Sequence, residues 1–495
     1  MKVQSTRGGQ EIPALNAVLQ GIASDGGLFV PETFPPIDLD EAKQCAEKSY
    51  SDLCGYVLSL FFDLGREDLS ALARSAYAGF DTPDTVPLRP LPENEYVMEL
   101  THGPTLAFKD MALQVLPRLT QAALEKEDTE ENILVLTATS GDTGKAAMAG
   151  FMDVSRTAIF VFYPDKGVAE MQRLQMVTQK GDNTGVCAVR GNFDDAQTGV
   201  KRLFASPQFR DAARSAGWTP SSANSINFGR LVPQIAYYVY AYAKLLADGK
   251  LGDGETVNCC VPTGNFGNIL AAYYARRMGI PIGRLVCASN SNNVLTDFFR
   301  SGSYNAGRPF HKTMSPSMDI LISSNLERFL YEMCGRDSAM VRAWMQALSE
   351  TGTYAVPADM LPAMQELIWA DWLSEEETAQ IIRDVFNSLG YLMDPHTAVA
   401  QGVCLKYRSA TGDRRPMITV STANPYKFPQ DVLHALTDSW VEEPFAAARE
   451  LSELTGTQIP PQIAELQQLP VLHDGVTDRD TMGDAVLRFL GRVKK

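Results

Sequence analysis

The sequence predicts an α/β protein built on parallel sheets. Apolar runs of four to six residues recur along the chain and alternate with helical segments. Runs of this kind are typical of strands whose two faces are both buried, as in a parallel sheet covered by helices. With 495 residues, 45% of them hydrophobic, the chain is long enough for two or three domains with a large core.

The first part of the chain, residues 1–85, carries helical patterns and few strand signals. A turn at Gly26-Gly27 precedes a short apolar run, and the polar stretch 81–84 with its proline is typical of a domain boundary. We therefore expect a mostly helical N-terminal domain over residues 1–85.

The alternating pattern occupies residues 86–435 and predicts the core of the protein. The expected strands of this core share an apolar run between helical segments: 133–137, 158–163, 186–190, 257–261, 285–288 and 418–421. A polar insertion at 290–320 interrupts the pattern, and we expect a mobile loop there that could cover a site. The last segment, 436–495, predicts a charged helical extension.

Charge and composition exclude several classes of function. A net charge of −15 argues against nucleic acid or an anionic membrane as the main partner. There is no apolar signal core at the start and no run of 18 apolar residues, which predicts a cytoplasmic location. The eight cysteines lack C-x-x-C spacing and predict reduced, buried thiols, and the five histidines lack metal-ligand spacing. We expect no metal.

The stretch Thr101–Asp110 stands out because it places a lysine at the start of a helix. A short strand, Tyr96–Leu100, precedes it. The helix is predicted by apolar residues at helical spacing: Phe108, Met111, Ala112, Val115, Leu116 and Leu119. Apolar neighbours and the helix dipole both favour the neutral amine of Lys109, the form that a Schiff-base lysine needs. An exposed first-turn lysine is the alternative reading of the position alone.

Two glycine-containing loops join expected strands to expected helices, where parallel sheets bind ligands. The first, 137–145, offers hydroxyls and amides for a carboxylate: Ser140, Gly141, Asp142 and Thr143. It is no Walker A loop, because Thr139 and Ala146 stand where that motif needs Gly and Ser or Thr. The second, 262–268, can direct backbone N–H groups at a phosphate: Gly264, Asn265, Phe266, Gly267 and Asn268. A structural turn is the alternative there.

A third loop, 421–428, follows the strand at 418 and has the sequence Ser-Thr-Ala-Asn-Pro-Tyr-Lys-Phe. By itself Thr422 is more simply read as a helix N-cap. A further segment, 224–230, ends in Arg230, whose guanidinium could bind a phosphate or form a structural ion pair.

These segments together resemble the threonine synthases, which are pyridoxal-phosphate (PLP) enzymes of the tryptophan-synthase-β-like fold type II. The resemblance rests on motifs in the family's order: Ser-Thr-Arg-Gly at 5–8, Asp-Gly-Gly-Leu at 25–28, His-Gly-Pro-Thr-x-Ala-Phe-Lys-Asp at 102–110, Ser-Gly-Asp-Thr-Gly at 140–144, Gly-Asn-Phe-Gly-Asn at 264–268 and Ser-Thr-Ala-x-Pro at 421–425. It implies a two-lobed core with PLP bound to Lys109. It also implies that loop 264–268 binds the cofactor phosphate and that the hydroxyl of Thr422 faces the pyridine nitrogen.

The resemblance further implies the last step of threonine biosynthesis. In that reaction O-phospho-L-homoserine and water give L-threonine and phosphate, with loop 140–143 at the substrate carboxylate and Arg230 as the candidate for the substrate phosphate. The alternatives are a serine/threonine dehydratase-like lyase and a catalytically silent paralogue that retains the cofactor. The expected partner is this small-molecule substrate, and the expected state is a monomer or homodimer.

Overall fold

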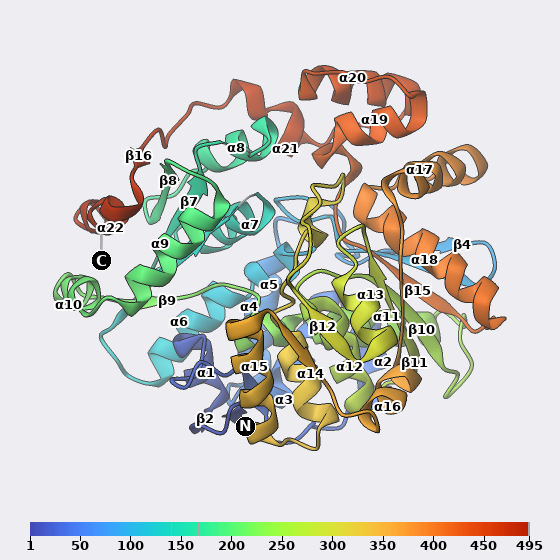
Figure 1. Ribbon diagram of the computed structural model, residues 1–495, viewed down its shortest axis with the longest axis horizontal. Helices are drawn as coiled ribbons and strands as arrows, with labels where there is room; N and C mark the ends of the chain where they lie inside the picture. The colour runs from blue at the N-terminus through green and yellow to red at the C-terminus, as the bar shows by residue number, and fades with distance from the viewer. Residues whose placement is uncertain (140, 167, 494–495) are drawn as a thin grey trace.

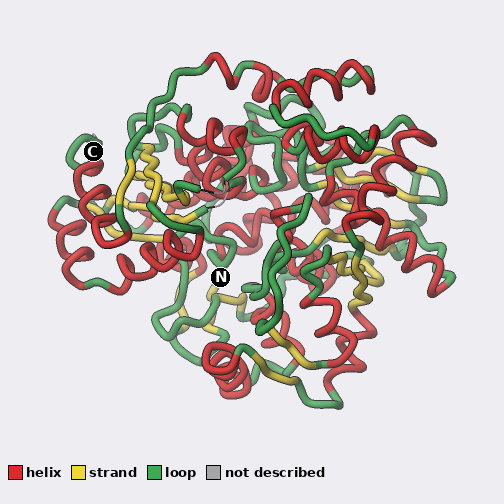
Figure 2. The backbone as a smooth tube through the Cα atoms, turned by 45° about the horizontal axis from the view of Figure 1, so that its top comes forward, coloured by secondary structure: helices red, strands yellow, loops and turns green. Residues whose placement is uncertain are grey.

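The computed structural model describes residues 1–139, 141–166 and 168–493. Two parallel sheets form its framework, and helices cover them (Figure 1). In Figure 2 the strands fall into two main groups separated by helices and loops. The predicted α/β class with parallel sheets is therefore confirmed.

The larger sheet has six strands in the order β14-β11-β10-β15-β5-β4. Its strands are β4 (Leu88–Leu91), β5 (Glu95–Glu99), β10 (Val257–Pro262), β11 (Ile282–Ser289), β14 (Ile368–Trp372) and β15 (Met417–Ser421). All neighbouring pairs are parallel except β4 with β5. The strands predicted at 257, 285 and 418 are three adjacent members of this sheet.

The smaller sheet has five parallel strands in the order β16-β8-β7-β6-β9. Its strands are β6 (Asn132–Ala138), β7 (Thr157–Pro164), β8 (Thr184–Val189), β9 (Trp218–Ser221) and β16 (Val476–Thr477). The strands predicted at 133, 158 and 186 are β6, β7 and β8. Strand β16 comes from the C-terminal segment, so the extension predicted as helical also contributes an edge strand to the core.

The N-terminal region contains the predicted helices together with a small antiparallel sheet that the sequence pattern did not predict. The helices are α1 (Ala14–Gln20), α2 (Leu39–Lys48), α3 (Tyr50–Phe61) and α4 (Arg66–Tyr77), and the strands are β1 (Lys2–Ser5), β2 (Glu11–Pro13) and β3 (Phe29–Pro31). Strands of three or four residues are too short to show a clear alternation of apolar and polar side chains.

The helices between the strands of the core cover the sheets. They are α5 (Asp110–Leu113), α6 (Leu116–Lys126), α7 (Asp142–Phe151), α8 (Glu170–Val177), α9 (Phe193–Ala205), α10 (Pro207–Ser215), α11 (Phe228–Ala247), α12 (Gly267–Arg277), α17 (Glu375–Leu389) and α18 (Pro395–Thr411). The longest of them, α11, is buried over most of its length and contacts α2, α3 and α12. It therefore joins the N-terminal region to the core.

The insertion after β11 is more regular than predicted. It contains α13 (Val294–Ser301), β12 (Ser303–Asn305), a 3₁₀ turn (Pro316–Met318), α14 (Leu326–Met333), α15 (Ser338–Thr351), β13 (Thr353–Ala355) and α16 (Met360–Leu367). Asn290 is buried and its amide donates to Thr313 Oγ1 and Ser315 Oγ, both at 2.9 Å, and to Asp319 Oδ1 at 2.8 Å. The polar residues that suggested a mobile loop therefore hydrogen-bond one another and anchor the segment.

The C-terminal segment crosses from the larger sheet to the smaller one, along the top of Figure 1. It contains α19 (Pro429–Thr437), α20 (Pro444–Thr455), α21 (Pro461–Ala464), 3₁₀ turns at Leu466–Gln468 and Arg479–Thr481, and α22 (Met482–Leu490). Val476 and Thr477 of β16 pair with Ala188 and Val189 of β8. The end of the chain thus joins the two parts of the core.

No helix within the described ranges combines the length and the apolar character needed to cross a membrane. All eight cysteines are free thiols, and all but Cys334 are buried. Burial raises the pKa of the Cys54 thiol and that of the Cys287 thiol to about 12 each, which keeps both thiols protonated.

Candidate active site

Four loops meet at the carboxyl ends of the parallel strands, where ligands bind in sheets of this kind. Three of the loops follow the neighbouring strands β10, β15 and β5 of the larger sheet, and the fourth follows β6 of the smaller sheet. The loops after β5 and β15 are hydrogen-bonded to each other, because Phe108 N donates to Thr422 O and Asn424 N donates to Leu106 O, both at 2.9 Å. These four loops are the Lys109 motif, loop 137–145, loop 262–268 and loop 421–428 of the sequence analysis.

Lys109 immediately precedes α5, as its motif predicts. The single helix predicted through Leu119 is instead two helices, α5 and α6, with a turn at residues 114 and 115. Pro117 lies in the first turn of α6. It has no N–H and its ring would clash with the carbonyl of Leu113 in a continuous helix, which explains the break.

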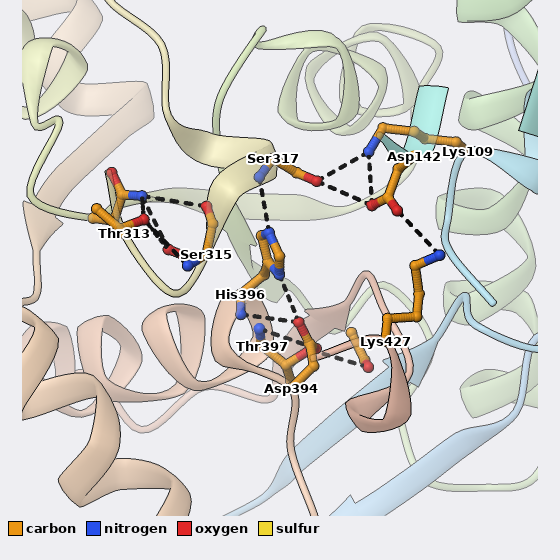
Figure 3. Close-up of polar contacts among 11 residues, drawn as sticks. Lys109, Asp142, Thr313, Ser315, Ser317, Asp394, His396, Thr397 and Lys427 are labelled. Atoms are coloured by element: carbon orange, nitrogen blue, oxygen red, sulfur yellow. Dashed lines mark hydrogen bonds and ion pairs between the residues drawn. The ribbon is translucent and has the colours of Figure 1, made fainter. Parts of the chain in front are cut away.

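The amine of Lys109 lies in a buried, polar setting (Figure 3). Its side chain is 11% exposed, and Nζ lies 3.1 Å from Ser317 Oγ and 3.4 Å from Asp142 Oδ2. Burial lowers the pKa of Lys109 below its ordinary value, and the positive charges of Arg230 and Lys427 lower it further, against the opposing charge of Asp142. This shift is toward the neutral amine that the sequence analysis requires.

Asp142 begins α7 and lies between two lysines. Its Oδ1 is 3.0 Å from Lys427 Nζ, and its Oδ2 accepts a hydrogen bond from Ser317 Oγ at 3.1 Å. Burial alone would raise the pKa of Asp142, but the charges of Lys427 and Lys109 outweigh that effect and hold the pKa well below its ordinary value. Asp142 is thus an ionised, hydrogen-bond-accepting group beside Lys109.

Lys427 is a site residue that the sequence analysis did not select. Its side chain is 1% exposed, and its Nζ also donates to Thr105 O at 2.8 Å. Its position just after the Ser-Thr-Ala-x-Pro motif was a usable signal, because that loop was already assigned to the site. Lys427 therefore ties three of the four loops together through Asp142 and Thr105.

Replacing Lys427 with methionine is expected to lower the free energy of unfolding by about 3 kcal/mol, at the low end for breaking a buried ion pair because Lys109 still faces Asp142. Urea unfolding at pH 7 measures the change. The folded-state pKa of Asp142 is below its unfolded value of about 3.9. The stabilisation by the pair is therefore present above about pH 4 and is lost as the pH falls toward the folded pKa.

The matched control is Lys244→Met, which breaks the exposed ion pair with Asp248 (3.0 Å). Because solvent screens this pair, we expect a change of less than about 0.5 kcal/mol. Equal effects of the two substitutions would contradict a structural role for the Lys427–Asp142 pair.

Loop 264–268 presents a set of unpaired donors. Within the described residues, no acceptor binds the backbone N–H groups of Gly264, Asn265, Phe266, Gly267 and Asn268, and α12 starts at Gly267. Asn268 Oδ1 accepts from the hydroxyls of Tyr237 and Tyr238 at 2.7 Å each, while its buried Nδ2 has no partner in the same set of residues. Donors at a helix N-terminus without acceptors form a site for an anion.

The backbone of this loop is closely covered. A Cβ on Gly264 would lie 2.8 Å from Ser317 O and 3.3 Å from Met318 Cα, so only glycine fits beneath the 3₁₀ turn of the insertion. Phe266 adopts φ +62°, a left-handed conformation that L-residues rarely take. The insertion predicted to cover a site thus lies directly over the loop predicted to bind a phosphate.

Thr422 and the loop after β6 complete the predicted set. Thr422 is 5% exposed, and no described residue hydrogen-bonds its hydroxyl. Gly141 lies at the N-cap of α7 and Thr143 in its first turn, whereas Ser140 lies outside the described residues. The hydroxyl of Thr139, which the sequence analysis did not select, accepts from Gly141 N and Gly144 N at 3.0 and 3.1 Å and so shapes this loop.

Arg230 lies in the first turn of α11 and is 5% exposed. Its Nη1 donates to Ala223 O at 3.0 Å, and no carboxylate in the described parts of the chain lies within ion-pair distance. Burial lowers its pKa to about 10, and its charge acts on Lys109. The structural ion pair considered as the alternative reading of Arg230 is therefore not formed with any described residue.

Ser317 lies beside Lys109, and it was missed together with His396 and Asp394, which lie behind it (Figure 3). Ser317 N donates to His396 Nε2 at 3.1 Å, so Nε2 is an acceptor and the proton of the ring is on Nδ1, 2.8 Å from Asp394 Oδ1. Asp394 also caps α18. This chain of bonds holds the hydroxyl of Ser317 toward Lys109.

The residues present fit PLP. The unpaired backbone amides of loop 264–268 and the unpaired Nδ2 of Asn268 suit the phosphate of PLP. The hydroxyl of Thr422, which has no described partner, suits the ring nitrogen. The buried amine of Lys109 suits a covalent link to the aldehyde carbon. Among the described residues, no group of three His, Cys, Asp or Glu side chains is arranged to hold a metal ion. The predicted site residues that the structure describes are thus brought together around one amine.

Comparison with known proteins identifies the family. Family models match residues 2–77 (threonine synthase N terminus), 84–423 (pyridoxal-phosphate dependent enzyme) and 397–480 (threonine synthase, C-terminal). The chain is 37% identical to the human threonine synthase-like 1 over 475 residues, which is 94% of this chain but 62% of that protein.

Other relatives match over most of their length. The threonine synthase of Pseudomonas aeruginosa is 39% identical over 437 residues, 87% of this chain and 90% of the relative. A crystal structure described as PLP-bound threonine synthase from Brucella melitensis superimposes with a TM-score of 0.88 at 36% identity and covers both chains completely. The chain therefore belongs to the threonine synthase family of pyridoxal-phosphate-dependent enzymes.

Proposed function

We propose that the protein is a threonine synthase, which converts O-phospho-L-homoserine and water into L-threonine and inorganic phosphate. The observation that carries this proposal is Arg230, a buried cation without a described carboxylate partner, whose charge acts on Lys109 and which is not a residue of loop 264–268. A substrate that bears its own phosphate needs a second anion site in addition to that of the cofactor. A lyase acting on serine needs only one phosphate site, that of the cofactor.

When bound, PLP supplies an electron sink that makes the Cα proton of an amino acid removable. The residues of this chain do the rest. The Nζ of Lys109 removes and returns protons at Cα and Cβ, and a pKa lowered by burial suits that role near neutral pH. Asp142 Oδ2 and Ser317 Oγ both accept hydrogen bonds from Nζ and so hold its direction.

Arg230 would hold the phosphate that leaves from Cγ, while a water oxygen adds at Cβ and supplies the hydroxyl group of threonine. The amides and hydroxyls of loop 140–143 would bind the substrate carboxylate. The hydroxyl of Thr422 would donate to the ring nitrogen and, unlike a carboxylate, would not hold that nitrogen protonated. A hydroxyl partner at the ring nitrogen favours elimination and replacement reactions over transamination.

The direct test is incubation of the purified protein with O-phospho-L-homoserine, with assays for threonine and released phosphate. Equal amounts of the two products are expected. L-Serine is expected to react poorly if at all, and faster turnover of serine than of O-phospho-L-homoserine would overturn the proposal in favour of a dehydratase-like lyase.

Arg230→Ala is expected to lower kcat/KM for O-phospho-L-homoserine about ten- to a hundredfold, because a charge-assisted contact to phosphate contributes on the order of 1.5–3 kcal/mol. The visible absorption band of the bound cofactor should be unchanged. Arg230→Met keeps most of the side-chain volume and should give the same loss, which separates the charge from packing. Unchanged kinetics in both variants would remove Arg230 from the substrate site.

We also propose a cytoplasmic location and a monomeric or homodimeric state. The buried free thiols support a reducing compartment. We further infer functional divisions at 1–85, 86–435 and 436–495, which limited proteolysis can test.

A further inference from the structure

A cavity of about 300 Å³ lies outside the active site. It is bounded by α4, by Pro104 of the Lys109 motif, by Gln114 and Arg118, by one side of α7 and by Gln179. Neither Lys109, Gly264, Arg230 nor Thr422 lines it. It is therefore a separate site, behind the loops that carry the proposed cofactor and substrate contacts.

Lys145 is the principal charged group of this cavity. It is on α7, one residue after the Ser-Gly-Asp-Thr-Gly motif, and its Nζ donates to Gln179 Oε1. No carboxylate of the described residues lies within ion-pair distance of it. Burial, together with the charge of Lys427 and against the charge of Asp110, lowers the pKa of Lys145 to about 8. The charged form of this partly buried amine therefore has one neutral acceptor and no negatively charged partner among the described residues.

Gln114 and Arg118 also line this space. Gln114 is 6% exposed, and its buried Nε2 has no hydrogen-bond partner among the described residues. Arg118 donates from Nε to Ser75 Oγ at 3.1 Å and from Nη1 to Gln114 O at 2.7 Å, which leaves its Nη2 without a described acceptor. An unsatisfied buried amide is rare in native proteins and indicates a missing partner.

The lining contains no Asp or Glu side chain, although the protein carries a net charge of −15. The ammonium of Lys145 and the guanidinium of Arg118 thus line one cavity, with the amide of Gln114 buried beside it, and no acid in the lining neutralises them. The donors match the acceptor oxygens of a phosphate group, which takes several hydrogen bonds from Lys and Arg at once. The volume is at the lower end for ligand sites and suits a small ion better than a nucleotide.

We propose that this cavity binds a small phosphate-class oxyanion through Lys145, Arg118 and Gln114. The ion is either free inorganic phosphate or the phosphate group of a small monoester. It accepts hydrogen bonds from Lys145 Nζ and the open side of Arg118, and from Gln114 Nε2 once the amide of Gln114 turns toward the cavity. Binding fixes Lys145 at the start of α7, the helix that also carries Asp142.

Equilibrium dialysis of the holoenzyme with labelled inorganic phosphate counts the sites. The wild type is expected to bind one phosphate more per chain than Lys145→Met. Gln114→Leu, which removes the unpaired amide at similar volume, should weaken that site about five- to tenfold. Arg230→Met removes the proposed substrate site and should leave the Lys145-dependent phosphate in place. Equal phosphate binding by wild type and Lys145→Met overturns the proposal.

Carbamylation by cyanate at pH 8, followed by peptide mapping, reports on Lys145 itself. Inorganic phosphate is expected to slow modification of Lys145 at least fivefold and to leave the exposed Lys250 unaffected. A parallel experiment replaces inorganic phosphate with phosphoethanolamine. Stronger protection of Lys145 by phosphoethanolamine than by inorganic phosphate would identify a phosphate monoester as the ligand. If potassium chloride at matched ionic strength protects Lys145 as well as phosphate does, the effect is only charge screening and the proposal is overturned. Protection of Lys145 by acetate but not by phosphate overturns it as well.

Discussion

Removing the amine of Lys109 by the substitution Lys109→Ala is expected to abolish turnover of O-phospho-L-homoserine, by a factor of about 10³ or more. The same nitrogen is proposed to hold the cofactor and to move protons at Cα and Cβ, so one substitution removes two functions. No other lysine replaces it. Lys427, the other buried lysine in contact with Asp142, has its Nζ directed to Asp142 Oδ1 and Thr105 O.

Borohydride reduction of the holoenzyme provides the measurement. It should fix a pyridoxyl label on the peptide that contains Lys109 in the wild type and on no peptide in Lys109→Ala. Lys244→Met, an exposed lysine remote from the four loops, should keep both the label and the turnover. A label on another lysine of the wild type would show that Lys109 is not the cofactor lysine.

The parts of the site that were predictable are those in which the chemistry and the fold are local in sequence. Loop 264–268 follows a buried apolar strand and precedes a helix, and its donors are backbone amides whose direction depends on neighbouring residues only. Lys109 could be placed at a helix start for the same reason. In both places the physical cause lies within about ten residues.

The parts that were missed depend on contacts between distant segments. Ser317 contacts Lys109 across 208 positions of sequence, and His396 fixes Ser317 across 79. Nothing in the local pattern of Ser, Asn and Gly at 290–320 distinguishes a solvated loop from one whose polar side chains satisfy each other. The segment is ordered because Asn290 hydrogen-bonds Thr313, Ser315 and Asp319. These residues come together only in the folded chain.

Short strands were missed for a related reason. Strand β16 has two residues and exists because Val476 and Thr477 meet the free edge of β8. The pairing is specified by where the C-terminal segment crosses the molecule, and two residues carry no periodicity of their own. Prediction of the six buried strands succeeded because each is a longer apolar run whose burial follows from composition.

Replacing Gly264 with valine is expected to reduce cofactor affinity by at least about a hundredfold while the protein stays folded. The new Cβ would lie 2.8 Å from Ser317 O, a backbone atom that cannot rotate away. Either the 3₁₀ turn at Pro316–Met318 moves or loop 264–268 does. Movement of the loop misdirects the amides that are proposed to bind the cofactor phosphate, and movement of the turn displaces Ser317 from Lys109.

Titration of the apoprotein with PLP, followed by the visible absorption band, measures the affinity, and far-ultraviolet circular dichroism checks the fold. Gly252→Val is the matched control, because a Cβ there has its nearest neighbour at 3.6 Å, in a flexible glutamate side chain. It should bind PLP as the wild type does. Since the collision at Gly264 is with backbone, Gly264→Ala should already show much of the loss of Gly264→Val. Wild-type affinity in both Gly264 variants would exclude this loop as the phosphate site and leave the unpaired amides of α12 unexplained.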